Sequence, residues 1–560
     1  MTKQKRYLIT TEDEVTWKFD QPVIFLGEWC RPYNRKHLWQ NMDAIVAKPY
    51  GLGEDQKDTD YKEIIDLEKK IFSELYEILN QHFHVTYSER FWQIFLGPWF
   101  RAILQLLSNR INTLKQCMQS EEISGTTLYY SDYSALATPN LKSSYNFFFE
   151  NKKWNNILNG RIINFLDNSK ITINFIDKLS TKYVYQNINS IVDSNNNLTI
   201  KSKVKKYIYK VYKKVTEILV RNNDSFLIST YFPTKELIKI ELALRQFPQI
   251  WTRSGLNLDL KPNQSLRKNL TKKFTKKSEN DLENILRILL FELLPVCYLE
   301  GFEKLNKIVH QQPWPKSPKL IFTSNNFGTD EIFKLYTAIK TESGIKYYVG
   351  QHGNNYFTRR YHFPKIEQKT CDKFLTWGWK MYPKYIPTFI FKTTGISGSY
   401  NRKGGLLLIE KSHEQRVETW DTYSEYLNYF EDQKKFYNKL ADEPKKNLTI
   451  RLSYSNVGIR LNENLRWLDF NKSLKLDNGK TPIIDLIAES RLLIHSYDST
   501  GILESLSQNI PTLAFWQNGL DHLREEVRPD YQNLIDAGII HLSAKSVADK
   551  VNEALQSSNQ

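Results

Sequence analysis

The residues best suited to chemistry gather in one late segment, His495–Glu504, which reads HSYDSTGILE. A short apolar run typical of a buried strand ends where this segment begins, and a helix is expected from about Thr500. Unpaired N–H groups at a helix start attract anions such as phosphate. Ser499 and Thr500 add hydroxyl donors, Gly501 allows close approach to the backbone, and Glu504 can accept from ribose or sugar hydroxyls. An ordinary helix cap beside a surface glutamate is the alternative interpretation.

A second cluster, YYVGQHGNNY, follows a predicted strand that ends at Gly350. In parallel sheets ligands bind beyond the carboxyl ends of strands, so Gln351, His352 and Gly353 are expected at the donor-binding cleft. His352 is the candidate catalytic acid, because its charge changes near neutral pH. A hydrogen-bonded turn histidine is the alternative. In the same stretch, Arg359 and Arg360 could pair with an anionic sugar.

Four further groups complete the candidate site. Asp330 and Glu331 open a predicted helix after the strand LIF, and they are candidate catalytic carboxylates, with Asp330 as nucleophile or base. The alternative is electrostatic, since carboxylates favour helix N-termini. Arg451, after the strand core LTI, is a candidate donor-phosphate contact or a surface arginine. Three residues after the first predicted strand are candidate acceptor contacts: Glu28, Trp29 and Arg31.

The elements that must position these residues alternate between strand and helix from about Ser225 onward. Such alternation predicts parallel sheets covered by helices, in an α/β protein. We expect two doubly wound Rossmann-like lobes, with helical additions in the N-terminal lobe. A Gly/Ser-rich stretch suggests the boundary. The predicted division is an acceptor-side lobe over residues 1–395, a linker over 396–405 and a nucleotide-donor-binding lobe over 406–560.

Several motifs are absent from the sequence. It contains no GxxxxGK[ST], no GxGxxG after a strand, no HExxH, no CxxC pair and no Asp-x-Asp in a convincing context. These absences favour a metal-independent reaction without a cofactor. The 4 cysteines lie far apart, which is typical of a reducing compartment.

The chain of 560 residues carries a formal net charge of +16, which favours anionic partners. Two basic segments, Lys201–Lys214 and Arg267–Lys277, are either solvated surfaces or sites for an anionic membrane. The N-terminus lacks the apolar core of a secretory signal, and no run of apolar residues is long enough to span a membrane. No nucleic-acid-binding motif accompanies the lysines. We expect a cytoplasmic protein that attaches peripherally to the inner membrane.

The His495–Glu504 unit resembles the nucleotide-binding segment of GT-B glycosyltransferases. The whole chain resembles an uncharacterised family of transferases encoded in bacterial surface-polysaccharide gene clusters, and it is more loosely similar to transferases that use CMP-linked 3-deoxy-ulosonic acids such as Kdo. The stretches that carry the family resemblance are Phe25–Cys30, Phe91–Arg101, Thr323–Lys334, Val349–Tyr356, Asp372–Trp379, Ile450–Tyr454 and Ser496–Glu504.

The resemblance implies a glycosyltransferase that moves a sugar from a nucleotide donor to a surface-glycan or glycolipid intermediate. Our preferred donor is a CMP-activated acidic sugar. One alternative is a transferase that moves polyol-phosphate from a CDP-linked donor. A second is a non-catalytic protein that binds glycan or nucleotide, and nucleic-acid binding through the lysines is the least favoured.

Overall fold

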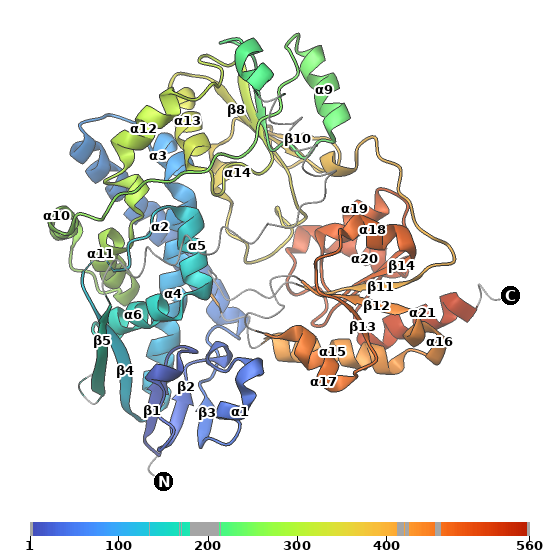
Figure 1. Ribbon diagram of the computed structural model, residues 1–560, viewed down its shortest axis with the longest axis horizontal. Helices are drawn as coiled ribbons and strands as arrows, with labels where there is room; N and C mark the ends of the chain where they lie inside the picture. Colours follow the sequence, from blue (N-terminus) through green and yellow to red (C-terminus); the bar gives the residue numbers. More distant parts are fainter. Residues whose placement is uncertain are drawn as a thin grey trace.

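The computed structural model describes residues 4–133, 135–166, 169, 171–179, 212, 214–411, 419–420, 425–453 and 461–556. Within these ranges the chain forms three β-sheets whose strand pairs are all parallel. Helices lie around and between the sheets (Figure 1). The predicted α/β class is confirmed. The number of sheets differs from the expectation, because residues 6–387 contain two sheets where one lobe was expected.

The first sheet is doubly wound, with the strand order β3-β2-β1-β4-β5. Its central strand, β1, consists of the four residues RYLI and is too short for a periodic pattern. The order reverses between β1 and β4, and such a reversal opens a crevice at the carboxyl ends of the two strands. The strands are β1 (Arg6–Ile9), β2 (Val23–Phe25), β3 (Ala44–Val46), β4 (Ile123–Ser131) and β5 (Thr172–Leu179).

The second sheet has the order β10-β9-β8-β7-β6, which follows the chain without reversal. It is therefore not doubly wound, and this corrects the expectation for this part of the chain. Apolar side chains fill its central strands because both faces are covered. The strands are β6 (Phe226–Ile228), β7 (Leu320–Thr323), β8 (Lys346–Gly350), β9 (Lys373–Thr376) and β10 (Tyr385–Pro387).

The third sheet has the order β13-β12-β11-β14-β15-β16, which is the doubly wound order of dinucleotide-binding folds. Its first strand begins at Gly405, the last residue of the predicted linker. The order reverses between β11 and β14. The strands are β11 (Gly405–Ile409), β12 (Leu448–Arg451), β13 (Lys475–Asp477), β14 (Ser490–His495), β15 (Thr512–Phe515) and β16 (Ile540–His541).

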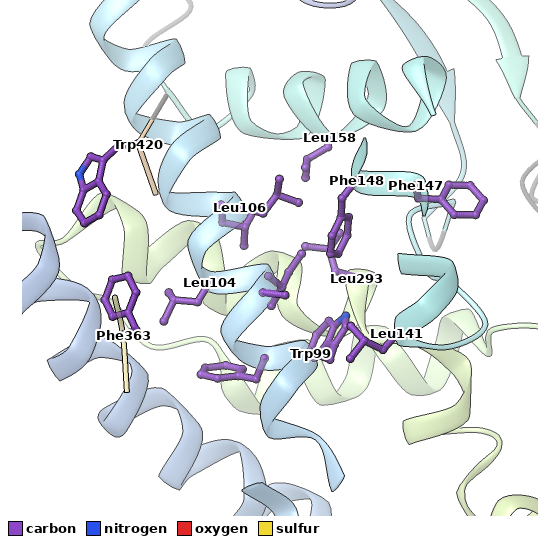
Figure 2. Close-up of a cluster of buried hydrophobic side chains, with 14 of the residues drawn as sticks. Trp99, Leu104, Leu106, Leu141, Phe147, Phe148, Leu158, Leu293, Phe363 and Trp420 are labelled. Carbon is purple, nitrogen blue, oxygen red and sulfur yellow. The ribbon is translucent and has the colours of Figure 1, made fainter. Parts of the chain in front are cut away.

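The helices inserted between the strands of the first sheet contribute to a large apolar core, part of which Figure 2 shows. Pro98 occupies the first turn of α4, where its missing N–H leaves no helix bond unmade. From this helix Trp99, Leu104 and Leu106 are fully buried. The helices of this part are α1 (Lys36–Trp39), α2 (Glu54–Phe83), α3 (Glu89–Phe95), α4 (Gly97–Ser120), α5 (Leu141–Glu150) and α6 (Lys152–Ile163).

The second and third sheets carry the remaining described helices. Those around the second sheet are α9 (Thr234–Ala243), α10 (Gln264–Phe274), α11 (Asp281–Leu293), α12 (Phe302–His310), α13 (Glu331–Glu342) and α14 (Ile366–Thr370). Those around the third are α15 (Glu425–Lys439), α16 (Asp442–Lys446), α17 (Glu463–Phe470), α18 (Ile483–Glu489), α19 (Thr500–Leu506), α20 (Arg528–Asp536) and α21 (Ala544–Gln556).

One aromatic cluster joins the third part of the chain to α2 and to the segment after β8. The Trp420 ring stacks on Phe363 with ring centres 6.4 Å apart, and its Nε1 donates to Oδ2 of Asp60 at 2.8 Å. Phe363 in turn stacks on Tyr61, with ring centres 4.8 Å apart. Figure 2 shows Phe363 and Trp420 on the same side of the core. These ring contacts link the three parts of the chain, and aromatic pairs of this kind stabilise such an arrangement.

Candidate functional site

The loop after β8 begins with a turn that the Gln351 side chain fixes. Nε2 of Gln351 donates to the Gly353 carbonyl at 2.7 Å. Its Oε1 accepts from the backbone N of Trp377 at 2.9 Å and from Nε1 of Trp379 at 2.8 Å. The amide group is buried and fully engaged. Gln351 was predicted to bind the donor, and in this structure it shapes the turn that carries His352.

His352 lies among the loops that follow three neighbouring strands of the second sheet. Its Nδ1 is 2.8 Å from the Tyr356 hydroxyl, which also hydrogen-bonds Oε1 of Glu367 at 2.7 Å. Burial, followed by the charges of Lys365 and Arg253, lowers the pKa of His352 to about 3. Burial raises the pKa of Glu367. His352 is therefore neutral at pH 7, and these three groups form a line along which a proton can pass.

The predicted cluster after β8, in the second sheet, is in direct contact with the predicted cluster after β14, in the third sheet. The backbone N of Asn354 donates to Oγ1 of Thr500 at 3.2 Å, and this hydroxyl lies 3.3 Å from Oδ1 of Asn354. Gly353 packs closely here, because a Cβ on it would lie 3.2 Å from the same hydroxyl and would require a small shift of that side chain. The loop after β8 and the loop after β14 thus form one continuous structure.

Asp498 lies at the centre of this junction, and the sequence reasoning missed it. Its carboxylate accepts from Nδ2 of Asn354 at 2.9 Å and from the Tyr531 hydroxyl at 3.0 Å, and it lies 3.3 Å from Nε2 of His522. These partners come from the loop after β8, from α20 and from the loop after β15. The sequence did contain one indication of Asp498, since it directly precedes the predicted Ser499–Gly501 turn.

The residues at the start of α19 have structural partners. Ser499 is the N-cap of the helix, and its hydroxyl accepts from the Gly501 N at 3.0 Å. A Cβ on Gly501 would lie 2.6 Å from Cε1 of His495, so Gly501 makes room for this ring rather than for a ligand. His495 is 2% exposed, and burial lowers its pKa to about 4. The cap that was the alternative interpretation is present at Ser499.

Glu504 and Arg451 both make ion pairs within the protein. Oε2 of Glu504 is 2.8 Å from Nζ of Lys392, which links α19 to the segment leaving the second sheet. Arg451 pairs with Asp477 and donates to the Thr481 carbonyl at 2.6 Å. It therefore joins β12 to β13, two strands away from β14. Donor binding by Glu504 and Arg451 stays a prediction.

Asp330 and Glu331 sit at the start of α13 with their oxygens occupied. Asp330 caps the helix by accepting from the Phe333 N at 3.0 Å, and its other oxygen accepts from the Ser254 N at 2.7 Å. Glu331 is buried, pairs with Lys334 at 2.9 Å and accepts from the Leu141 N at 3.0 Å. This geometry is that of a helix cap and a buried ion pair, and a catalytic role for either carboxylate stays a prediction.

The three predicted acceptor contacts lie at the carboxyl end of β2, in the first sheet. Arg31 and Glu28 pair with each other, with an oxygen–nitrogen distance of 2.6 Å, and Trp29 is buried with its ring 5.7 Å from the Arg110 guanidinium. No hydrogen bond, ion pair or ring contact links Glu28, Trp29 or Arg31 to the His352 or Ser499 loops among the described residues. Their acceptor role stays a prediction.

The two basic segments have different outcomes. Lys201–Lys214 lies outside the described residues except for residues 212 and 214. In Arg267–Lys277, Arg267 is not on the surface: it is fully buried, its Nε is 2.7 Å from Glu300, and it donates to the Phe291 carbonyl at 2.7 Å. Membrane binding by the remaining lysines stays a prediction. No helix in the described ranges is both long enough and apolar enough to cross a bilayer.

Across the described ranges, no three His, Cys, Asp or Glu side chains are grouped in a way that could hold a metal ion. The expectation of a metal-independent reaction stays a prediction.

The fold and the junction define an α/β protein with a candidate ligand site where the carboxyl ends of two parallel sheets meet. The model of the LIC12162 family transferases matches residues 6–559, and the chain therefore belongs to this family. This family membership supports a general transferase role. No curated protein matches the sequence significantly.

Proposed function

We propose that the protein transfers a glycosyl group from a nucleotide-activated donor to a glycan acceptor, at the junction of the second and third sheets. The observation that carries this proposal is the direct contact of Asn354, after β8, with Thr500 and Asp498, after β14. Loops at the carboxyl ends of parallel strands are where α/β proteins bind ligands. A junction built from two such loops suits a reaction between two substrates.

The topology of the third sheet supports the donor side. Its strand order reverses between β11 and β14, and ligands of doubly wound folds bind at this reversal. Ser496 lies at this point, and its backbone N donates to the Ile409 carbonyl at 3.1 Å. We therefore assign the nucleotide to the crevice beside Ser496–Gly501. The net charge of +16 favours an anionic donor, and a CMP-activated acidic sugar remains the preferred one.

The hydrogen-bonded line of His352, Tyr356 and Glu367 is our candidate for proton transfer. It contains titratable groups in direct contact at the carboxyl end of β8, next to the junction. A group-transfer enzyme needs a base for the acceptor hydroxyl or an acid for the leaving group. A neutral histidine backed by a tyrosine and a carboxyl can serve either need, because the proton is shared along the line.

Thermal shifts with CMP, CDP, UDP and GDP test the donor assignment, because a ligand that binds only the folded protein raises its melting temperature. We expect one nucleotide to give the largest shift, and Thr500→Val to reduce that shift. The control is Thr59→Val, on the exposed start of α2, which should keep the full shift. Equal shifts in Thr500→Val and the wild type would place the nucleotide elsewhere. A product with a new phosphodiester would favour the polyol-phosphate alternative.

A further inference from the structure

The segment after β8 carries an arginine without an acidic partner. The backbone of Arg359 forms an isolated antiparallel β-bridge with the backbone of Leu523, in the loop after β15. Its Nε is buried and has no hydrogen-bond acceptor, and no carboxylate pairs with its guanidinium in the part of the chain that the structure describes. The adjacent Arg360 contrasts with it, because Arg360 pairs with Asp58 at 2.9 Å and with Glu54 at 3.5 Å.

Other basic groups surround Arg359. Nε of Arg524 lies 3.4 Å from the Arg359 carbonyl, and Arg524 has no carboxylate partner among the described residues. His362, on the same segment, has a buried Nε2 without a hydrogen-bond partner. Burial, followed by the positive charges of Lys365, Arg359, Arg101 and Arg524, lowers the pKa of His362 to about 3.

Three acidic side chains near this cluster have other partners, and the exposed Asp521, Glu525 and Glu526, which neighbour Arg524 in the chain, form no ion pair with it. Glu68 pairs with Arg101, and Glu367 accepts from the Tyr356 hydroxyl at 2.7 Å while lying near Lys365. Asp498 accepts from Tyr531, whose hydroxyl also feels the charge of Arg359. No ion pair among the described residues therefore joins a carboxylate to Arg359 or Arg524. Both arginines are half-buried, and charges drawn partly away from water are normally paired, so a group from outside is expected to supply the negative charge.

We infer that Arg359, Arg524 and His362 form a receptor for an oxyanion of the substrate, either a phosphate or a carboxylate. This inference rests on the proposed function, and it specifies the chemical class of the group held beside the junction. The planar guanidinium of arginine presents parallel N–H donors that match two oxygens of such an anion. His362 would add a third donor once the anion raises its pKa and it takes up a proton.

Calorimetric titration with sodium pyrophosphate and, separately, sodium pyruvate tests the receptor at constant ionic strength. We expect at least one of the two to bind the wild type, with binding weakened at least tenfold by Arg359→Gln. The matched control is Arg360→Gln, which removes the same charge one residue away and should change affinity less than threefold. Binding of pyrophosphate alone identifies a phosphate, and binding of pyruvate alone identifies a carboxylate.

Two further measurements keep the inference falsifiable. If Arg359→Gln does not fold, judged by circular dichroism, Arg524→Gln replaces it with the same expectation. In wild-type protein with labelled histidine, the bound anion should also raise the pKa at which the His362 resonance titrates. The inference is overturned if neither anion binds the wild type, or if the Arg359 and Arg360 variants lose affinity equally. Arg359-dependent binding without any glycosyl transfer would instead refute the proposed function and leave the receptor standing.

Discussion

Nδ2 of Asn354 donates to Oδ1 of Asp498 at 2.9 Å, so two residues separated by 144 positions meet where two sheets converge. Asp498 also accepts from Tyr531, which lies on α20 of the third sheet. The aspartate thus orients the loop after β14 and fixes it to the second sheet at the same time. The junction is sensitive to the loss of this contact, since an unpaired buried group costs more than the hydrogen bond itself contributes.

Asp498→Asn should destabilise the protein by about 1–3 kcal/mol, because the amide keeps the shape but loses the charge that strengthens three hydrogen bonds. Chemical denaturation gives the free energy of unfolding. Asp521→Asn, at an exposed position in the nearby loop, is the control and should change stability by less than about 0.5 kcal/mol. Equal effects of the two changes would show that Asp498 does not hold the junction.

Gly501→Ala should destabilise the protein despite the higher helix propensity of alanine. The propensity gain is about 1 kcal/mol, whereas forcing a Cβ to 2.6 Å from the buried His495 ring costs about 1–3 kcal/mol. In a His495→Ala background the same change has room and should become neutral or stabilising. Gly328→Ala, where a Cβ meets nothing within 4 Å, is the control. Additive effects in the double variant would contradict the steric explanation.

His352 should stay neutral throughout pH 5–8, because its pKa is lowered to about 3 by burial and nearby positive charge. Nuclear magnetic resonance of labelled histidine measures this, with the His352→Asn variant identifying the signal. The same nucleus in urea-unfolded protein is the reference and should titrate near pH 6.5. A folded-state titration near 6.5 would contradict the burial of this ring.

Tyr356→Phe should lower turnover by roughly 10²-fold or more if the proton passes through this hydroxyl. The buried ring stays in place, so folding should be little affected. The matched control is Tyr348→Phe, which removes a hydroxyl from β8 of the same sheet and should retain activity. Unchanged turnover in Tyr356→Phe would exclude the proposed line of proton transfer. The pKa of His352, measured in the same variant, shows whether the burial of that ring is preserved.

The free energy of unfolding should fall as pH rises from about 4.5 to 8, because of one buried carboxyl group on α9. Burial raises the pKa of Glu241 to about 8, so the folded protein holds a proton that the unfolded chain releases above about 4.5. Glu241→Gln should flatten this dependence, measured by denaturation at several pH values. Glu236→Gln, on the same helix and paired with Lys239, should leave it intact. An unchanged slope in Glu241→Gln would refute the assignment.

The sequence predicted the strands of the second and third sheets well, because runs such as KYYVG and LLLIE are apolar, short and bounded by polar residues. It missed the first sheet as a separate unit, since β1 has four residues and its neighbours in space, β2 and β4, lie apart in the chain. The order of strands within a sheet could not be predicted from the sequence either. Without that order, the second sheet, whose strands follow the chain, could not be distinguished from a doubly wound sheet.

The sequence predicted where the His352 and Ser499 loops lie relative to their strands, but not the contacts that their side chains make. The His352 and Ser499 loops were expected at carboxyl ends of strands, and the structure joins them through Asn354 and Thr500. What a side chain touches depends on residues far away in the chain: Gly501 faces His495, and Arg267 lies inside the protein. The local sequence shows which hydrogen bonds and charges a side chain can contribute. The packing of distant segments determines whether residues within the protein already occupy them.

The segment between Gln351 and Lys365 contacts α2, the loop after β15 and the loop after β14, as well as its own sheet. A protein truncated near residue 400 would therefore lack the loops after β14 and β15, which this segment contacts in the full chain. Such fragments should be recovered as insoluble material, and the intact chain should melt in a single calorimetric peak rather than in three.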